Sequence, residues 1–396
     1  MTFELIYKIN LMSSKIKVLQ VIPRLGYGGA ETGCYDLAHY LSENNCQSYL
    51  ITSGGPLLKY IKKDRVKLFR LPVHSKNPLL MILNSIFITF IILFFNISIV
   101  HARSRAPAWS CLLATKLTRR KFVTTFHGTY NFNNTLKKFY NSAMVRSDLV
   151  IAGSNFIFSH IYENYEKYID NKNRKLLVIF RGINSEYFSQ KNVSNTKLLK
   201  QIKEWQIDKN KFIILLPGRL TNWKGQIVFI EALNILNQQT YVKPFSAIIL
   251  GSDQDRKVYY KKLLSLVEKY RLNQKIKFIP FCKEMPLAYK LADVVVSASI
   301  EPEAFGRVSV EAQSMEKPII ASDIGGSKET ILKDKSGLFF KSGDPISLVE
   351  KLKEILSFDD NTLKLMGIEG RKNVLKKFDI EKMCNSTIAE YKKLIN

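Results

Sequence analysis

Two carboxylates stand eight positions apart in the segment EPEAFGRVSVEA (301–312), namely Glu303 and Glu311. A strand-like run precedes them and a helix-like run follows, so we expect Glu303 on a turn and Glu311 on the helix behind it. Eight helical steps would span about 12 Å, which exceeds the roughly 5–10 Å between the carboxyl groups of glycosidases. The pair is therefore expected to contact different parts of one extended ligand, with backbone amides from Phe305 to Val308 holding an anionic group between them. The alternative is a helix-terminal acid and an unrelated surface residue.

Basic and glycine-rich residues stand at the ends of other strand-like runs. Arg219 and Lys224, in LLPGRLTNWKG (215–225), combine a guanidinium fork with a point charge, which suits a diphosphate, although such a pair also occurs in solvated loops. LGYGGAE (25–31) is a glycine-rich turn before a helix, and it lacks the G-x-G-x-x-G spacing of nicotinamide dinucleotide sites. His127, in TTFHGTY, follows another strand; a functional and a structural role both remain open for it.

The composition indicates a folded protein of two domains in a reducing compartment. The chain has 396 residues, too many for one ordinary core, with 46% hydrophobic and 24% charged residues. Its five cysteines are scattered and never spaced as C-x-x-C, which argues against a disulfide framework or a zinc site. The N-terminus lacks the features of a secretory signal, and Met12 is an alternative start. The formal net charge of +26 fits an anionic membrane surface, compositional drift or nucleic acid, although no nucleic-acid-binding signature is present.

Strand-like and helix-like runs alternate along the chain, which predicts doubly wound parallel sheets that bind ligands beyond the carboxyl ends of their strands. A Lys/Asn-rich stretch at 189–210 shows little periodicity and is expected to be a linker. The predicted fold is therefore α/β, with two Rossmann-like domains facing each other across a ligand-binding cleft. The expected strands are 16–22, 48–52, 97–104, 121–128, 147–154, 211–219, 245–252, 275–281, 292–299 and 317–323. The expected parts are an N-terminal extension (1–15), a first domain (16–190), a second domain (191–375) and a C-terminal helix (376–396) that packs back on the first domain.

One segment, 78–100, is uncharged and long enough to cross a membrane. Polar residues such as Asn84 and Ser85 interrupt it, and its end fits a strand that leads to His101. We therefore expect a helix of about 18 residues followed by a buried strand, because a true span would divide the first sheet. Three interpretations of the helix at 78–95 remain open: membrane insertion, an interfacial helix on a membrane surface, and a buried crossover helix.

From about residue 16 onwards the chain resembles glycosyltransferase family 4, a family of retaining enzymes with the two-domain GT-B fold. The resemblance rests on the E-x7-E pair at Glu303 and Glu311, on Arg219 with Lys224, and on His127 in its FHG context. Residues 301–329 are most similar to bacterial envelope polysaccharide and lipopolysaccharide enzymes. Further matching segments are GYGGAE (26–31), FRGIN (180–184), GGSKETI (325–331) and SGLFFKSGDP (336–345).

The resemblance implies a role for each matching residue. Arg219 and Lys224 would bind the donor's diphosphate and stabilise the leaving nucleotide. Glu303 would hold the transferred sugar, Glu311 the ribose hydroxyls, and His127 would contact the sugar and orient the reacting carbon. The other implied donor-binding residues are Gly28, Gly29, Gly218, Phe281 near the nucleotide base, Phe305, Gly306 and Val308.

The resemblance also implies chemistry without a metal or a cofactor, because fixed cations would offset the charge that develops on the departing diphosphate. Asp253 and Asp255, in SDQD, are spaced like the metal-binding aspartates of another transferase fold. They follow a strand and precede a helix, so Asp253 is expected to cap that helix.

These observations predict a retaining, metal-independent glycosyltransferase that moves a sugar from a UDP- or GDP-linked donor to a lipid-linked, lipopolysaccharide or polysaccharide acceptor. The expected location is the cytoplasm, at the inner face of the cytoplasmic membrane, with an anionic membrane surface and no nucleic acid as partner. One alternative is a nucleotide-sugar 2-epimerase of the same fold. The other is a non-catalytic basic nucleic-acid-binding protein, which gives no account of Glu303 and Glu311.

Overall fold

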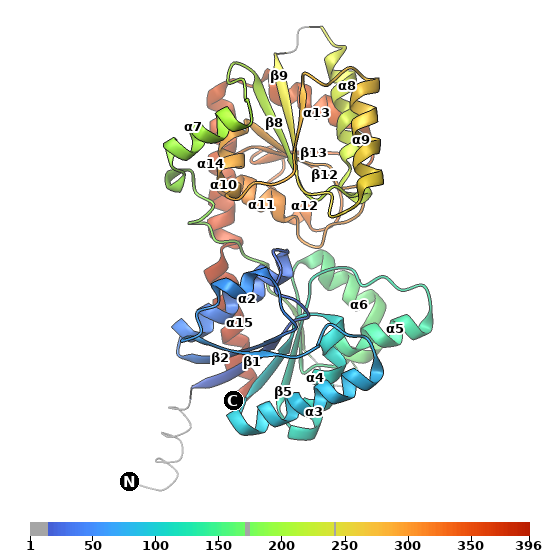
Figure 1. Ribbon diagram of the computed structural model, residues 1–396, viewed down its shortest axis with the longest axis vertical. Coiled ribbons are helices and arrows are strands. Elements are labelled where there is room, and N and C mark those ends of the chain that lie inside the picture. Colours follow the sequence, from blue (N-terminus) through green and yellow to red (C-terminus); the bar gives the residue numbers. More distant parts are fainter. Residues whose placement is uncertain (1–14, 171–174, 241–242) are drawn as a thin grey trace. The chain divides into compact units, whose positions relative to one another are not determined.

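The computed structural model describes residues 15–170, 175–240 and 243–396. The predicted N-terminal extension (1–15), with Met12, lies outside the described residues except for Lys15. The chain forms two compact units, one running up to Gly182 and including Ile380–Asn396, the other spanning Ile183–Asp379. These boundaries lie eight and four residues from the predicted ones at 190/191 and 375/376. Each unit is a parallel sheet covered by helices (Figure 1), and each is described by itself below.

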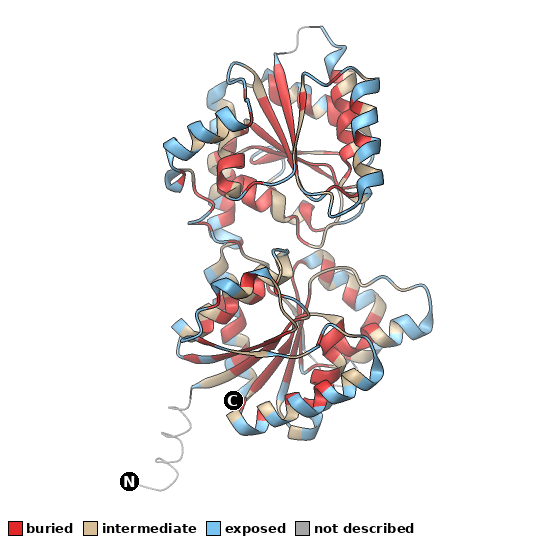
Figure 2. Ribbon diagram, viewed as in Figure 1, coloured by how far each residue is buried: buried red, intermediate tan, exposed pale blue. Residues whose placement is uncertain are grey.

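The first unit is built on a seven-stranded parallel sheet of order β3-β2-β1-β4-β5-β6-β7 among the described residues. Its central strands are apolar because helices cover both faces, and Figure 2 shows buried strands beneath helices with exposed outer sides. The order reverses between β1 and β4, where such sheets bind ligands. The strands are β1 (Ile16–Val21), β2 (Cys46–Thr52), β3 (Val66–Arg70), β4 (Ile99–Ala102), β5 (Lys121–Phe126), β6 (Leu149–Ala152) and β7 (Lys175–Val178). The helices are α2 (Gly29–Glu43), α3 (Pro78–Phe95), α4 (Arg105–Thr118), α5 (Thr135–Asn141), α6 (Asn155–Ile169) and α15 (Ile380–Ile395), with short 3-10 turns at Pro56–Tyr60 and Ser142–Val145.

The C-terminal helix α15 is part of the first unit. Its buried Cys384 and Ile388 share a core cluster with Leu37 and Leu41 of α2. Tyr391 is also buried, and its hydroxyl lies 2.5 Å from Nδ1 of His101 on β4. This contact anchors α15 to the sheet across 290 positions of sequence.

The second unit is built on a six-stranded parallel sheet of order β10-β9-β8-β11-β12-β13 among the described residues. The order reverses between β8 and β11, so the carboxyl ends of these two strands mark the switch point. The strands are β8 (Phe212–Pro217), β9 (Phe245–Leu250), β10 (Ile276–Ile279), β11 (Val294–Ser297), β12 (Ile319–Ser322) and β13 (Gly337–Phe340). The helices are α7 (Asn195–Glu204), α8 (Gln226–Asn237), α9 (Lys257–Lys269), α10 (Met285–Leu291), α11 (Arg307–Ser314), α12 (Ser327–Thr330), α13 (Pro345–Ser357) and α14 (Asp360–Lys377), with 3-10 turns at Gln190–Asn192 and Asn222–Lys224.

Four elements differ from the sequence expectations. The edge strands β3, β7 and β13 were not predicted. Charged residues interrupt β3, and none of the four residues of β7 is fully buried. The expected linker at 189–210 contains α7, which Ser194 caps by accepting a hydrogen bond from the backbone amide of Lys197. None of the α7 residues is fully buried, but Leu198, Leu199 and Ile202 recur at helical spacing, a pattern that sequence reasoning missed.

The uncharged segment 78–100 forms a helix and a strand, as predicted. Asn77 caps α3 at its start, and Asn96, in the left-handed conformation (φ 51°), ends it. The buried strand β4 follows and pairs with β1 and β5. By length and composition alone, α3 is the helix in the described part of the chain that could cross a membrane.

Candidate functional site

Lys224 and Glu303 meet at the switch point of the second sheet. Lys224 belongs to the loop after β8 and Glu303 to the turn after β11, and the Lys224 Nζ atom lies 2.7 Å from Oε1 of Glu303. A backbone hydrogen bond of 2.8 Å, from the amide of Ile300 to the carbonyl of Trp223, joins the same two loops. The fold therefore places a cation and a carboxylate where sheets of this class bind their ligands.

The Glu303 carboxylate is buried but kept ionised. Its side chain is 10% exposed, and Ser299 donates a second hydrogen bond of 2.5 Å to Oε1. Burial alone would raise the pKa of Glu303, but the charge and hydrogen bond of Lys224, with hydrogen bonds from Ser299 and Ser297, hold the pKa below its ordinary value. An ionised carboxylate is an acceptor only, so Glu303 is suited to bind ligand hydroxyl groups.

Glu311 has a separate set of partners. It lies on α11 with its side chain 8% exposed, and the Arg307 Nε atom lies 2.5 Å from Oε1. The hydroxyl of Tyr289, on α10, donates a 2.7 Å hydrogen bond to Oε2. Tyr289 is fully buried, and burial followed by the Glu311 charge raises its pKa well above the ordinary value, so its hydroxyl stays protonated and remains a donor. Glu311 is thus a second, oriented acceptor.

The start of α11 lies between the two carboxylates along the chain. The helix begins at Arg307, so only the last steps from Glu303 to Glu311 are helical, and the 12 Å separation worked out for a continuous helix does not apply. Gly306 caps the helix with φ 85°, and a Cβ there would lie 2.9 Å from Oγ of Ser327, so the position favours glycine. The Phe305 ring is buried against Phe378. The backbone of Phe305 lies just before the start of α11, and Val308, in the first turn of the helix, is half-buried.

The loop after β8 contains the other predicted donor residues. Arg219 is exposed, and its carbonyl accepts a 2.9 Å hydrogen bond from Gln226. Gly218 precedes it with φ 154°. Gly225, the N-cap residue of α8, has φ 72°, and a Cβ there would lie 1.7 Å from the carbonyl oxygen of Ala298. A larger residue at 225 would therefore push the Lys224 loop away from β11.

Phe281 lies apart from the contacts described so far. It follows β10 and is 72% exposed, which leaves its ring free to stack on a planar group.

The predicted residues of the first unit lie at the carboxyl ends of its strands. Gly28 and Gly29 form the start of α2, after β1. His127 follows β5, and within the described residues neither of its buried ring nitrogens has a hydrogen-bond partner. Burial, followed by the charges of Arg103 and Arg181, lowers the pKa of His127 well below its ordinary value, so the imidazole is neutral. An unpaired neutral imidazole can donate one hydrogen bond and accept another from a ligand.

Asp253 does not cap a helix, contrary to the sequence expectation. Helix α9 begins at Lys257 after Arg256, and the Asp253 carboxylate instead accepts a hydrogen bond from the backbone amide of Asp255. Within the described ranges, no group of three or more His, Cys, Asp or Glu side chains is placed to hold a metal ion.

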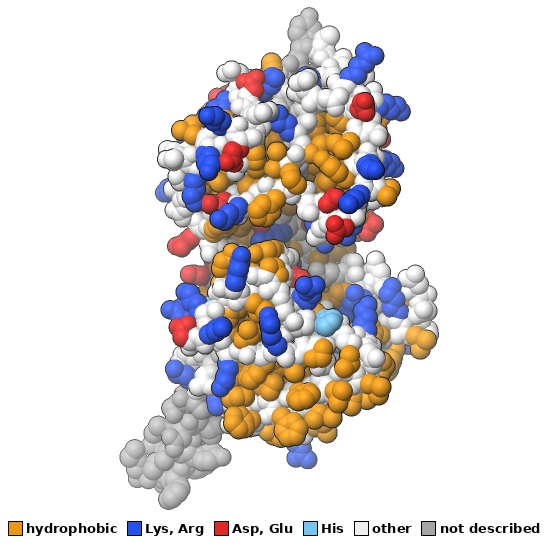
Figure 3. All heavy atoms as spheres, in the orientation of Figure 1, with side chains coloured by type: hydrophobic (Ala, Val, Ile, Leu, Met, Phe, Trp, Pro, Cys, Tyr) orange, Lys and Arg blue, Asp and Glu red, His pale blue; other side chains and the backbone are white. Residues whose placement is uncertain are grey.

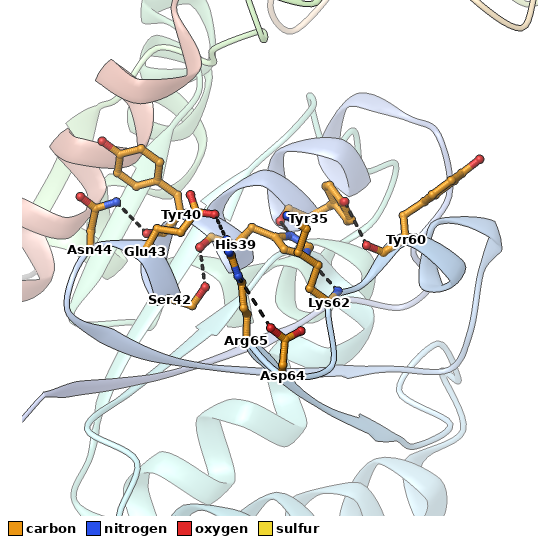
Figure 4. Close-up of polar contacts among 10 residues, drawn as sticks. All are labelled: Tyr35, His39, Tyr40, Ser42, Glu43, Asn44, Tyr60, Lys62, Asp64 and Arg65. Atoms are coloured by element: carbon orange, nitrogen blue, oxygen red, sulfur yellow. Dashed lines mark hydrogen bonds and ion pairs between the residues drawn. The ribbon is translucent and has the colours of Figure 1, made fainter.

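A polar cluster of the first unit lies near the amino ends of β2 and β3, at the opposite end of the strands from the predicted site residues (Figure 4). His39 on α2 accepts a 3.2 Å hydrogen bond at Nε2 from the backbone amide of Lys62, and Arg65 pairs with Glu43. A hollow of about 730 Å³ beside it is lined by Ser42, Glu43, Cys46, Gln47, Ser48, Tyr49, Lys63, Asp64, Arg65 and Lys67. These contacts connect α2 to β3, and the hollow contains none of the predicted site residues.

Comparison with known proteins identifies the family. The second half of the chain, residues 199–373, matches the model of the Glycosyl transferases group 1, and residues 27–187 match that of Glycosyltransferase Family 4. A glycosyltransferase from Rickettsia africae ESF-5 is 36% identical, the match covers 97% of this chain and 99% of that one, and the TM-score is 0.88. The chain is a GT-B glycosyltransferase.

Two further proteins resemble this glycosyltransferase over almost its whole length. An uncharacterized glycosyltransferase of Methanocaldococcus jannaschii is 26% identical over 400 residues, covering 94% of this chain and 95% of its own length. The Anabaena protein HepE, in complex with UDP and glucose, shares the fold with a TM-score of 0.79 at 21% identity, covering 95% and 98% of the two chains.

The structure adds residues to the site that sequence reasoning missed. Ser299, Tyr289 and Arg307 hold the two carboxylates of the glycosyltransferase in place. Ser299 and Arg307 each stand four positions before the glutamate they contact, a spacing that could have drawn attention to them. Tyr289 lies on another helix, 22 positions from Glu311, and no local pattern indicates it.

Proposed function

We propose that this glycosyltransferase takes a sugar from a nucleotide diphosphate sugar, linked to UDP or GDP, and transfers it with retention of the anomeric configuration and without a metal ion. The observation that carries the proposal is the Lys224–Glu303 pair at the switch point of the second sheet, followed along the chain by the start of α11 and by Glu311. Acceptor-only carboxylates bind hydroxyl groups, while a lysine and a helix start bind phosphate. This succession matches the sugar, diphosphate and ribose of such a donor.

The proposed chemistry follows from where charge develops. When the bond between the anomeric carbon and the diphosphate oxygen breaks, its electron pair stays on the diphosphate. Lys224, which Glu303 already holds in position, and the exposed Arg219 would offset that negative charge. The acceptor oxygen attacks the face that the diphosphate leaves, and its proton passes to the departing phosphate oxygen. By the resemblance to glycosyltransferase family 4, neutral His127 would orient the sugar, one unpaired ring nitrogen donating a hydrogen bond and the other accepting one.

We further propose a lipid-linked, lipopolysaccharide or polysaccharide acceptor and a location in the cytoplasm, at the inner face of the cytoplasmic membrane. The similarity of residues 301–329 to envelope enzymes and the net charge of +26 support this part. UDP is the first nucleotide to test, because HepE is described in complex with UDP and glucose.

The test is calorimetric titration of UDP and GDP, with and without EDTA, on the wild type and on Glu311→Ala. Loss of hydrogen bonds to a charged group costs about 1.5–3 kcal/mol, so we expect affinity for one nucleotide to fall roughly 10- to 150-fold. Glu350→Ala, which removes an exposed glutamate of α13, is the matched control and should bind normally.

Four results would contradict the proposal. Absence of binding to either nucleotide would remove the donor assignment, and EDTA-sensitive binding would contradict metal independence. Isomerisation of the donor sugar without transfer would favour the epimerase, while salt-sensitive binding to any DNA duplex in place of nucleotide binding would favour the nucleic-acid alternative.

A further inference from the structure

The first unit carries a large apolar surface centred on α3. Eight α3 side chains are between 45 and 83% exposed, and they recur every three or four positions, which places them along one side of the helix. Helix α4, which packs on α3, adds two more. Figure 3 shows the hydrophobic side chains gathered over these helices. This surface, called the apolar face below, consists of Leu79, Ile82, Leu83, Ile86, Phe87, Phe90, Leu93 and Phe94 of α3 and Leu113 and Leu117 of α4.

The inner side of α3 contains the polar residues, which reverses the usual pattern of a surface helix. Four α3 residues are buried, and two of them, Asn84 and Ser85, are polar. Asn84 donates a 3.2 Å hydrogen bond to the carbonyl of Pro72, and Ser110 of α4 donates one of 2.8 Å to that of Met81. The helix is therefore held flat against the unit by polar contacts, while its most apolar side faces outward.

Positive charge surrounds this apolar surface in the sequence. Residues 65–147, which contain α3, α4 and α5, include 13 lysines and arginines and not one aspartate or glutamate. This segment is about a fifth of the chain and supplies half of the net charge of +26. Exposed cations stand beside the face: Lys76 precedes α3, and Lys116 and Arg119 lie at the end of α4. The combination of an uncharged apolar helix and a cationic border matches the layered chemistry of an anionic bilayer.

We propose that the apolar face is a membrane-docking surface, which inserts into the headgroup region of an anionic lipid bilayer with α3 lying in the plane of the interface. The proposal deepens the proposed function, and it rests on that function for the presence of the acceptor at a membrane. Docking itself requires neither donor nor acceptor.

Two features favour a bilayer that lies against α3 over two alternatives, namely a second copy of the chain docked on the apolar face and a transmembrane α3. A second copy docked through the same face would bring two cationic borders together, and like charges oppose that contact. A transmembrane arrangement would need α3 to leave the sheet, yet α3 joins β3 and β4 of one sheet, and Lys17 of β1 donates a 3.0 Å hydrogen bond to the carbonyl of Phe95 at its end. The helix thus lies on the membrane and does not cross it.

The test is co-sedimentation of the full chain with vesicles of phosphatidylcholine alone and of phosphatidylcholine mixed with phosphatidylglycerol. The variant Phe90→Glu/Phe94→Glu places two carboxylates on the apolar face at residues that are 65 and 83% exposed. Val258→Glu, at an 86% exposed position of α9 in the second unit, is the matched apolar-to-acid control. Lys116→Gln/Arg119→Gln removes two border cations without altering the apolar side chains.

We expect the wild type and Val258→Glu to bind the mixed vesicles, and the double glutamate variant to bind them at least roughly tenfold more weakly. The glutamine variant should prefer phosphatidylglycerol less strongly than the wild type does and retain residual binding. Equal binding by the double glutamate variant and the wild type would overturn the proposal. So would a wild type that ignores both vesicles but forms dimers in analytical ultracentrifugation that the double glutamate variant does not form.

The failure of this proposal is distinguishable from failure of the proposed function. UDP titration on the same samples should give the same affinity for the wild type and the double glutamate variant, which also shows that the variant is folded. Intact UDP binding without vesicle binding would overturn docking alone. Vesicle binding by a protein that binds neither nucleotide would overturn the donor assignment alone.

Discussion

Replacement of Lys224 by methionine tests the electrostatics at the switch point most directly. In the wild type, Lys224 and Glu303 form a largely buried pair 2.7 Å long, with side chains 13 and 10% exposed. The substitution removes the cation and leaves Glu303 with hydrogen bonds from serine but no countercharge. Methionine keeps most of the side-chain volume, so the change is mainly one of charge.

The expected cost is large because breaking a buried pair leaves a charge without compensation. Such changes cost about 3–5 kcal/mol, a substantial part of the roughly 5–15 kcal/mol that stabilises a typical domain. The sign of the pH dependence follows from Glu303. Burial raises its pKa and Lys224 opposes that shift, so without Lys224 the pKa rises above the unfolded value. The folded variant then binds more protons than the unfolded one. The free energy of unfolding of the variant therefore falls further below that of the wild type as the pH rises.

The assay is urea unfolding of the variants at about pH 5 and pH 8, combined with a transfer assay. Lys224→Met/Glu303→Gln removes both charges, and we expect it to recover stability to within about 1 kcal/mol of the wild type while remaining inactive. Lys328→Met, which breaks the exposed pair with Asp323, is the matched control and should cost at most about 1 kcal/mol. The reasoning would be refuted by wild-type stability of Lys224→Met at pH 8, or by a double variant as unstable as the single one.

Two further predictions concern the remaining polar contacts. Tyr289→Phe removes a hydrogen bond to Glu311 and should weaken UDP binding by about 10-fold or more in titration calorimetry. Tyr391→Phe, which loses the buried contact with His101, should lower stability but leave the UDP affinity unchanged. Equal UDP affinities for the two variants would contradict the role of Tyr289 in positioning Glu311. Burial lowers the pKa of both His101 and His127, so below about pH 6.5 the unfolded chain binds more protons than the folded one. As the pH is lowered, the free energy of unfolding should therefore decrease by about 1.4 kcal/mol per pH unit for each histidine, until the pKa of that histidine in the folded state is reached. A urea midpoint that stays constant between about pH 7.5 and 5.5 would contradict the second prediction.

Much of the fold could be predicted from the sequence, because a strand that is buried on both faces of a sheet is recognisable as a short, nearly continuous apolar run. The central strands β1, β8 and β11 are of this kind, with most or all of their residues buried. The edge strand β3 was missed because only Val66 of its five residues is fully buried and charged residues interrupt its pattern. The helix α7 was missed although Leu198, Leu199 and Ile202 follow helical spacing, because its three lysines made the stretch resemble a linker.

The candidate site was predictable in its residue types but not in its contacts. Glu303, Lys224 and Glu311 were identified from spacing and from the resemblance to glycosyltransferase family 4. Their partners depend on strand order: Lys224 and Glu303 stand 79 positions apart and meet because β8 and β11 are neighbours. Tyr289 of α10 reaches Glu311 of α11 because the fold of the second unit brings the two side chains together, and no local sequence pattern indicates this contact.

The helix at 78–95 shows the division between sequence and tertiary structure most clearly. Its length, its lack of charge and its cap at Asn77 follow from the sequence, because backbone hydrogen bonding and capping are local. Apolar residues occur all around this helix, so composition alone does not determine which side is buried. The tertiary structure decides that, because the polar contacts of Asn84 and Met81 turn one side towards the unit and leave Phe90 and Phe94 exposed.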